Sequence, residues 1–176
     1  MFEKCFLLLL AGHALGDFYF QNDGLAAKKD SRPAYLLLHG LLYALALLLL
    51  SLPVLSGPLA LGFLALAGLH LLVDGIKFLY LRSSWKKSRL PFGPRRAMAL
   101  YAGDQLLHLF CLAATAYVLA VKGEELVLLP FAQRFLEVTG WNGGRLLAWF
   151  AVLLLLYKPA NISIARFLAG YRQESK

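Results

Sequence analysis

The amino-acid sequence predicts an all-α integral membrane protein, a polytopic bundle of about five transmembrane helices. Two observations support this class. The chain has 176 residues, of which 60% are hydrophobic and only 16% are charged, and its mean hydropathy is +0.63. These values are typical of polytopic membrane proteins and not of soluble domains. The apolar residues also form runs close to the length of about 20 residues that a helix needs to cross the hydrocarbon core.

Five apolar runs are candidate spans, and the first and the last of them are short. They are residues 3–20, 34–55, 58–80, 97–121 and 144–158. Proline residues lie at or near their ends, where helices begin and end. The further apolar segment 124–138 is charged at both ends and contains Pro130, so we expect an interfacial or re-entrant piece there. We also expect a short amphipathic helix on the membrane surface over 162–171.

These runs predict a single integral membrane domain over residues 1–176. Its core, 1–121, would carry the functional site, and 122–176 would be a peripheral C-terminal part. The N-terminus differs from a signal peptide because Glu3 stands where basic residues are expected and no small-residue cleavage site follows. We therefore expect the first helix to be retained.

Basic residues in the loops predict the orientation of the chain. Loops 21–33 and 81–96 and the C-terminal tail are rich in Lys and Arg, whereas loop 51–58 has none. Because basic loops stay in the cytoplasm, we expect the N-terminus outside and the C-terminus inside, in a bacterial inner membrane. The formal net charge of +8 is explained by this bias, and no basic run with interleaved aromatic residues indicates a nucleic-acid partner.

All four histidines lie in the apolar runs, and three of them have an aspartate four residues away. The pairs are His13/Asp17, His70/Asp74 and Asp104/His108, and the fourth histidine is His39. A spacing of four places both side chains of a pair on one helix face. Such groups are expensive inside a bilayer, so they need partners and usually mark function.

The depth of these seven residues is also informative. With the predicted topology and a rise of about 1.5 Å per residue, all seven lie roughly 6–16 Å from the cytoplasmic ends of their helices. Unrelated polar residues on helices of alternating direction would have no reason to agree in depth, so we expect them to meet. Glycines beside them would let the helix backbones approach closely; these are Gly12, Gly16, Gly40, Gly75 and Gly103.

Imidazole and carboxylate together suit a divalent metal, most often Zn, with Mn or Fe as alternatives. We expect one or two ions, because a cation would offset three buried carboxylates and seven ligands exceed the needs of one zinc ion. The expected ligands are His13, Asp17, His39, His70, Asp74, Asp104 and His108. A proton or ion path and a purely structural hydrogen-bond network are the alternative interpretations.

Four further polar residues could assist this site. Gln21 lies one turn beyond Asp17, and Gln105 precedes His108 by three positions. Lys77 follows Asp74 by three positions, so it either neutralises that carboxylate or extends to the membrane interface. Asn161 either caps the tail helix or contributes an amide to the site.

The motifs around these residues resemble a family. H-A-L-G-D-F-Y-F-Q, L-L-L-H-G, H-L-L-V-D-G-I-K and D-Q-L-L-H occur in this order over roughly residues 5–115. They resemble the bacterial membrane proteins grouped as domain of unknown function 3307, which have no established activity to carry over. The architecture is more distantly similar to the LexA-regulated-type membrane-bound metal-dependent hydrolases, and fold-level analogy of this kind does not establish function.

The leading hypothesis is an intramembrane metal-dependent hydrolase that acts at the cytoplasmic leaflet through a metal-activated water. Asp17 or Asp104 would be the general base, and the substrate would be an amphiphile such as a phospholipid or an isoprenoid phosphate. The basic residues of loop 81–96, whose presence the topology already explains, could also gather anionic lipid headgroups. They are Arg82, Lys86, Lys87, Arg89, Arg95 and Arg96. The alternatives are a proton or divalent-metal transporter and a non-catalytic structural subunit. Membrane lipid is the expected partner, and the oligomeric state is left open.

Overall fold

The computed structural model describes residues 1–88, 93–123 and 125–171, with the side chains of 85–88 and 170 excepted. All regular elements in these ranges are helices. In chain order they are α1 (Phe2–Ala14), the π-helical turn η1 (Leu15–Tyr19), α2 (Asp23–Lys29), α3 (Pro33–Ser51), the 3₁₀ turn η2 (Leu52–Val54), α4 (Gly57–Ser88), α5 (Pro94–Val121), α6 (Pro130–Thr139), α7 (Gly143–Tyr157) and α8 (Pro159–Tyr171).

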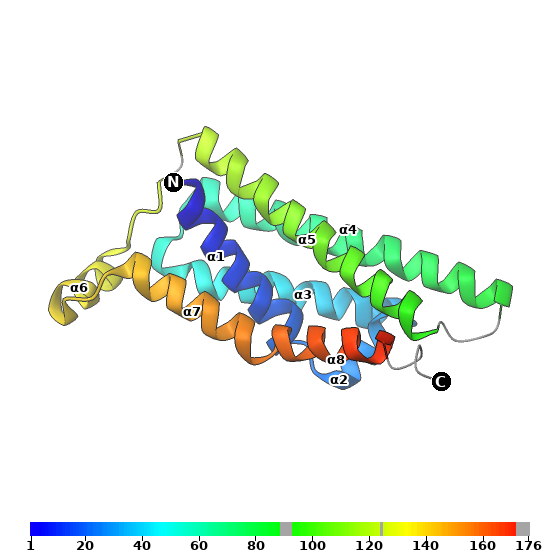
Figure 1. Ribbon diagram of the computed structural model, residues 1–176. Coiled ribbons are helices and arrows are strands. Elements are labelled where there is room, and N and C mark those ends of the chain that lie inside the picture. Colours follow the sequence, from blue (N-terminus) through cyan, green and yellow to red (C-terminus); the bar gives the residue numbers. More distant parts are fainter. Residues whose placement is uncertain (89–92, 124, 172–176) are drawn as a thin grey trace.

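The long helices pack side by side in one bundle, and α1 contacts α3, α5 and α7 (Figure 1). The N-terminus and α6 lie at one end of this bundle, and α2 and α8 lie at the other. We refer to these as the α6 end and the α2 end. The arrangement gives α1 neighbours on several sides, which suits a helix that carries His13.

Four helical segments are long and apolar enough to cross a membrane, namely Pro33–Val54, Gly57–Ser84, Pro94–Val121 and Gly143–Ala169. The predicted class, an all-α integral membrane bundle, is therefore confirmed. The fourth segment joins α7 and α8 across Pro159, where we expected a separate surface helix over 162–171. Proline is compatible with the first turn of a helix, so α8 begins directly after α7 and packs against α5.

Large apolar side chains cover the outside of the bundle, as lipid contact requires. Leu61, Leu106 and Phe110 are 69%, 67% and 71% exposed. An apolar core fills the α6 half of the interior, with Leu9, Leu59 and other residues of α1, α3, α4 and α5 packed together. The bundle is thus apolar outside and in its α6 half, which confines buried charge to the α2 half.

The segment before α7 does not span the bundle. Residues 125–129 are irregular, and Leu126 and Leu128 pack against the apolar core. The Leu129 N–H donates to the carbonyl of Pro53 at 2.8 Å. The following helix α6 is short, and exposed Phe131, Phe135 and Val138 give it an apolar surface. The interfacial or re-entrant location expected for 124–138 stays a prediction, and Glu124 lies outside the described residues.

Glycine allows α1 and α3 to approach closely. A Cβ atom on Gly12 would lie 2.6 Å from Leu47 Cδ2, and one on Gly16 would lie 2.7 Å from Tyr43 Cδ2 and 3.0 Å from its Cα. The predicted role of this small-residue pair is confirmed. For Gly75 and Gly103 the prediction is wrong, because a Cβ there would meet no atom within 4 Å.

We expect Gly16→Ala to lower the free energy of unfolding by about 1–3 kcal/mol, because overpacking against the α3 backbone must be relieved. Gly103→Ala is the matched control, since open space surrounds that position. The midpoint of thermal unfolding in detergent measures both. Equal midpoints for the two variants would contradict close packing of α1 on α3.

Candidate functional site

The site begins with a change of helix type at the end of α1. Residues Leu15–Tyr19 form a π-helical turn, closed by the Phe20 N–H donating to the Leu15 carbonyl at 2.8 Å. A π turn inserts an extra residue into an α-helix and re-aims the side chains that follow, and such turns are frequent at functional sites. Asp17 lies in this turn and is buried with 4% exposure.

The structure brings all seven predicted histidines and aspartates together in the α2 half of the bundle. Each of them is between 0% and 8% exposed. His13 and Asp17 come from α1 and η1, His39 from α3, and the remaining two pairs from α4 and α5. Side chains from helices distant in sequence therefore share one buried centre.

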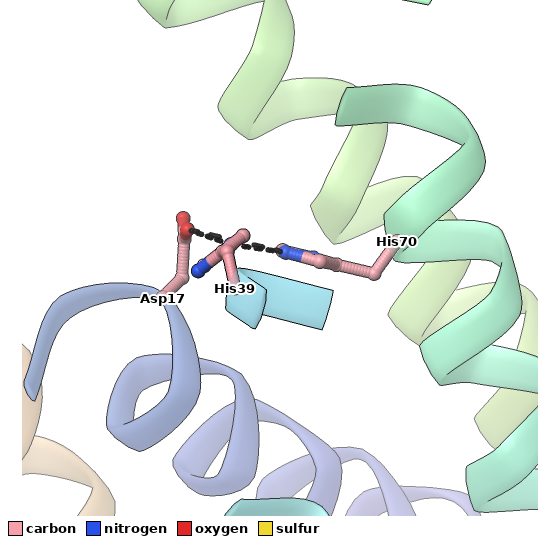
Figure 2. Close-up of side chains that lie close together, drawn as sticks. All are labelled: Asp17, His39 and His70. Carbon is pink, nitrogen blue, oxygen red and sulfur yellow. Dashed lines mark hydrogen bonds and ion pairs between the residues drawn. The ribbon is translucent and has the colours of Figure 1, made fainter. Parts of the chain in front are cut away.

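Four donor atoms converge most closely. His39 Nε2 lies 3.0 Å from His70 Nε2, 3.3 Å from Asp17 Oδ1 and 3.2 Å from Asp74 Oδ2. His70 Nε2 lies 4.0 Å from Asp17 Oδ1 and 3.7 Å from Asp74 Oδ2. Figure 2 shows Asp17, His39 and His70 reaching this point from three different helical segments. We call these four side chains the donor cluster.

The spacing within the donor cluster suits a small divalent ion. Four ligands placed tetrahedrally at about 2.0–2.2 Å from zinc lie about 3.3–3.6 Å from one another. Five of the six distances between the four atoms, from 3.0 to 4.0 Å, bracket this range. The chemistry of two imidazoles and two carboxylates also matches what zinc binds in proteins.

His13 and His108 lie deeper, and His13 Nε2 is 4.0 Å from Asp17 Oδ2, its predicted partner. Neither nitrogen of either ring makes a hydrogen bond within the described part of the chain. The His13 and His108 ring centroids are 5.4 Å apart, and those of His70 and His108 are 4.2 Å apart. Donor atoms of His70, Asp74 and His108 lie within 4.8 Å of one another, so a second ion could bind there.

Tyr43 fixes the orientation of one imidazole of the donor cluster. Its ring stacks on His70 at a centroid distance of 3.6 Å and an interplanar angle of 8°. Tyr43 is itself 1% exposed and belongs to the apolar core. The sequence offered little indication of this role, because an aromatic residue in an apolar helix is normally interpreted as part of the hydrophobic core.

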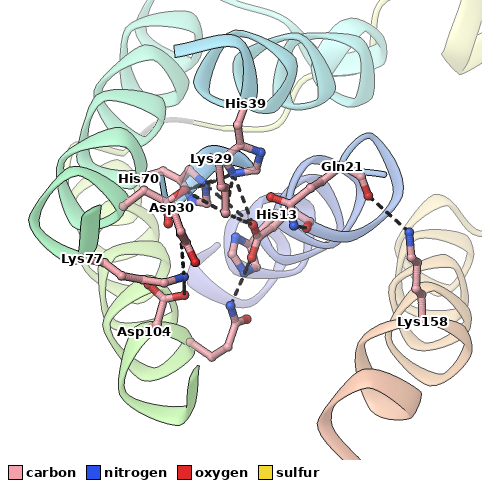
Figure 3. A network of polar contacts seen from close by, with 12 residues as sticks. His13, Gln21, Lys29, Asp30, His39, His70, Lys77, Asp104 and Lys158 are labelled. Atoms are coloured by element: carbon pink, nitrogen blue, oxygen red, sulfur yellow. Dashed lines mark hydrogen bonds and ion pairs between the residues drawn. The ribbon is translucent and has the colours of Figure 1, made fainter. Parts of the chain in front are cut away.

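Lys29 is the functional residue that the sequence analysis missed. It was read as part of a basic loop, yet it is 5% exposed and its ammonium touches three atoms of the donor cluster. Lys29 Nζ lies 3.0 Å from Asp74 Oδ2, 3.4 Å from Asp17 Oδ1 and 3.2 Å from His39 Nε2 (Figure 3). Leu25, one helical turn earlier, is buried on the same face of α2, and this spacing is the signal that could have located Lys29.

The pKa of Lys29 follows from these contacts. Burial by itself would lower the pKa, but the carboxylates of Asp17 and Asp74 outweigh it and raise the pKa to about 12. Lys29 is therefore charged at neutral pH. It supplies a cation for Asp17 and Asp74 in addition to the metal and Lys77, which were the cations considered from the sequence.

The accessory residues take different positions from those expected. Lys77 pairs with Asp104 at 3.2 Å and with Asp30 at 3.7 Å, and not with Asp74, whose carboxylate is occupied by Lys29. Each lysine thus neutralises an aspartate on a neighbouring helix.

The three amide residues divide between the site and the surface. Gln105 donates to Asp17 Oδ2 at 3.1 Å, and the Gln21 side chain donates to the Asp17 carbonyl at 3.0 Å. Both therefore hold Asp17 in place. Asn161 is exposed and donates to the carbonyl of Tyr157, so it neither enters the site nor caps the start of the tail helix.

A cavity of about 210 Å³ lies beside the cluster at the α2 end. Asp17, Lys29 and Asp104 form part of its wall, and Lys158 and Arg166 form another part. The C-terminal part of the chain, expected to be peripheral, therefore contributes to the site.

Of the basic loop residues expected to gather headgroups, Arg89 and the side chains of Lys86 and Lys87 lie outside the described residues. Those that are described line no part of this cavity; they are Arg82, Arg95 and Arg96.

Comparison with known proteins gives one match. The model of a family described as "Protein of unknown function (DUF3307)" matches residues 5–134. The matched range contains the donor cluster, His13, His108 and Asp104. No curated protein and no solved structure matches the chain.

We expect Lys29→Gln to destabilise the metal-free protein strongly, by about 3–5 kcal/mol, because it leaves two buried carboxylates without a cation. Zinc should then raise the unfolding midpoint more in Lys29→Gln than in the wild type, where the ammonium competes for the same atoms. Thermal unfolding in detergent with EDTA or with Zn²⁺ measures this difference.

Lys28→Gln is the control for that variant, since Lys28 is the exposed neighbour on the same short helix. It should leave both the midpoint and its response to zinc unchanged. If zinc stabilises Lys29→Gln no more than it stabilises Lys28→Gln, the donor cluster does not bind the ion.

Proposed function

We propose that this chain, which belongs to the DUF3307 family of proteins of unknown function, is an intramembrane metal-dependent hydrolase. One divalent ion, preferentially Zn²⁺, would bind to His39, His70, Asp17 and Asp74, and the substrate would be an amphiphile. The observation that carries the proposal is the convergence of four buried donor atoms beside an open cavity, with five of the six distances between them at 3.0–4.0 Å.

A divalent ion at these atoms would polarise the scissile group and make a nearby water more acidic. The side chains of the chain itself supply the remaining functions. Both aspartates proposed from the sequence line the cavity, but Asp104 is the better general base because its Oδ1 accepts no hydrogen bond within the described residues. Lys77 holds its other oxygen at 3.2 Å. Asp17 is instead committed to the donor cluster and to Gln105.

Lys29 would take a second position when the ion binds. Its ammonium lies against three donor atoms and also lines the cavity. Repulsion between two cations would move Lys29 toward the cavity, where its charge faces an anionic substrate. His13 and His108 would orient water or bind a second ion, since their nitrogens are buried and make no hydrogen bond within the described chain.

The predicted topology gives this site a location. The α2 end carries the basic loops, so it would face the cytoplasm, and the cavity would open toward the cytoplasmic leaflet of a bacterial inner membrane. Candidate spans of 27 and 28 residues exceed the length needed to cross the hydrocarbon core, so their α2 ends can reach the headgroup region. An amphiphile could then place its polar group in the cavity while its tail stays in lipid.

Two other functions compete with this proposal. A transporter of protons or divalent metals would need a polar path through the α6 half, and that half is filled by the apolar core. A structural subunit without chemistry is favoured by a different observation, the neutralisation of Asp17, Asp74 and Asp104 by Lys29 and Lys77. Metal content separates this structural alternative from the hydrolase.

We expect the purified protein to contain zinc, or to take it up, and to release phosphate from phosphatidic acid in mixed vesicles. EDTA should abolish the release. Asp104→Asn should lower the rate by a factor of about 10²–10⁴ while metal content is retained, because general acid–base groups contribute on that order. Elemental analysis and a phosphate assay measure the two effects.

The controls make the result decisive. His70→Ala should lose metal, and Glu137→Gln, which alters an exposed helix far from the cluster, should change neither quantity. Folded protein that takes up no zinc, iron or manganese after reconstitution would refute the metal centre and favour the structural alternative.

A further inference from the structure

The cavity beside the donor cluster has two chemically different walls. One carries both signs of charge, with Asp17, Asp23, Lys29, Asp30, Lys77 and Asp104, and the other is formed by Lys158, Ile162 and Arg166. The last three residues are spaced by four along the chain, which places them on one face of the helix that starts at Pro159. Ile162 and Arg166 on this face of α8, together with Lys158 just before the helix, therefore line the cavity beside the candidate site.

The two cations of this wall are held without carboxylate partners in the described part of the chain. Lys158 Nζ donates to the carbonyl of Phe18 and, at 3.4 Å, to that of Gln21. Figure 3 shows the contact with Gln21. Arg166 lies over the ring of Tyr101 at 4.7 Å from its centroid. Both side chains are thus positioned by neutral groups, and their full positive charge is available to a ligand. Lys77, by contrast, is engaged by Asp30 and Asp104.

We infer that this cavity binds the phosphate group of an amphiphile, with Lys158 and Arg166 as its cationic wall. A phosphate carries between one and two negative charges and several acceptor oxygens, which matches two cations and leaves other oxygens facing the donor cluster. The inference rests on the proposed amphiphilic substrate, but binding requires no hydrolysis.

The size of the cavity supports a headgroup as the bound part. Its volume of about 210 Å³ is below the roughly 300–1,000 Å³ of pockets that enclose whole drug-sized ligands. Phe18 and Ile162 add apolar surface beside the cations, as the first carbons of a lipid tail would require. A phosphate fits inside, and the tail extends along the bundle surface.

Binding is tested with the full chain in phosphatidylcholine nanodiscs, with EDTA present so that no metal-dependent turnover occurs. The probes are dihexanoyl phosphatidic acid, dihexanoylglycerol and inorganic phosphate, measured by equilibrium dialysis against empty nanodiscs. We expect Lys158→Gln and Arg166→Gln each to weaken binding of the phosphatidic acid about tenfold, as the loss of a charge-assisted hydrogen bond implies. Arg166→Lys should retain most of the affinity.

Arg145→Gln is the matched control, because Arg145 is an exposed cation at the opposite end of α7. It should bind the phosphatidic acid like the wild type. If Lys158→Gln fails to fold, Arg166→Gln decides the question, since its guanidinium contacts one ring at the bundle edge. Equal affinity of Arg166→Gln and Arg145→Gln would overturn the inference, and so would inorganic phosphate or dihexanoylglycerol binding as tightly as phosphatidic acid.

The same preparation separates this inference from the proposed hydrolase. Zinc is added after the binding measurement, and phosphate release is followed. Cation-dependent binding without release would support the phosphate site and reject hydrolysis. Release without any dependence of binding on Lys158 or Arg166 would support hydrolysis and reject the phosphate site.

Discussion

The compensation of buried carboxylates is the constraint on which the rest of this structure depends. Asp17, Asp74 and Asp104 are all at least nine-tenths buried in a chain that presents leucine and phenylalanine to its surroundings. Ionised carboxylates in such a setting cost several kcal/mol each unless a cation and hydrogen bonds accompany them. Lys29 and Lys77 supply those cations, and the close approach of α1 to α3 through glycine brings the partners within reach.

The fold and much of the site could be predicted from the sequence. Hydropathy gave most of the long helices within a few residues, although α4 continues to Ser88, beyond the predicted end at residue 80. The spacing of His13 from Asp17 and of His70 from Asp74 indicated shared faces. The convergence of the polar side chains from different helices could also be predicted, because polar residues in lipid need partners. These predictions succeeded because bilayer burial penalises an unpartnered polar group severely, so few arrangements remain.

Other parts of the site could not be predicted, for identifiable reasons. Lys29 and Lys158 occur in short connecting segments, where a lysine normally indicates only the cytoplasmic side. Whether such a lysine reaches the site depends on how the connecting helix packs against the bundle. The pairing of Lys77 with Asp104 was not among the two alternatives considered for Lys77, because sequence spacing indicates contacts within one helix, whereas Asp104 lies on the neighbouring one. The π turn at Asp17 has no simple sequence signal, since its extra residue fits no regular period.

The position of Lys29 on α2 has a consequence for how the protein is assembled. Helix α2 is only seven residues long and connects two membrane-embedded segments, so it cannot insert on its own. Its ammonium reaches Asp17 and Asp74 where α2 packs on α3. The polar centre is therefore complete only when this short connecting helix is docked, and an undocked α2 would leave both carboxylates without their cation.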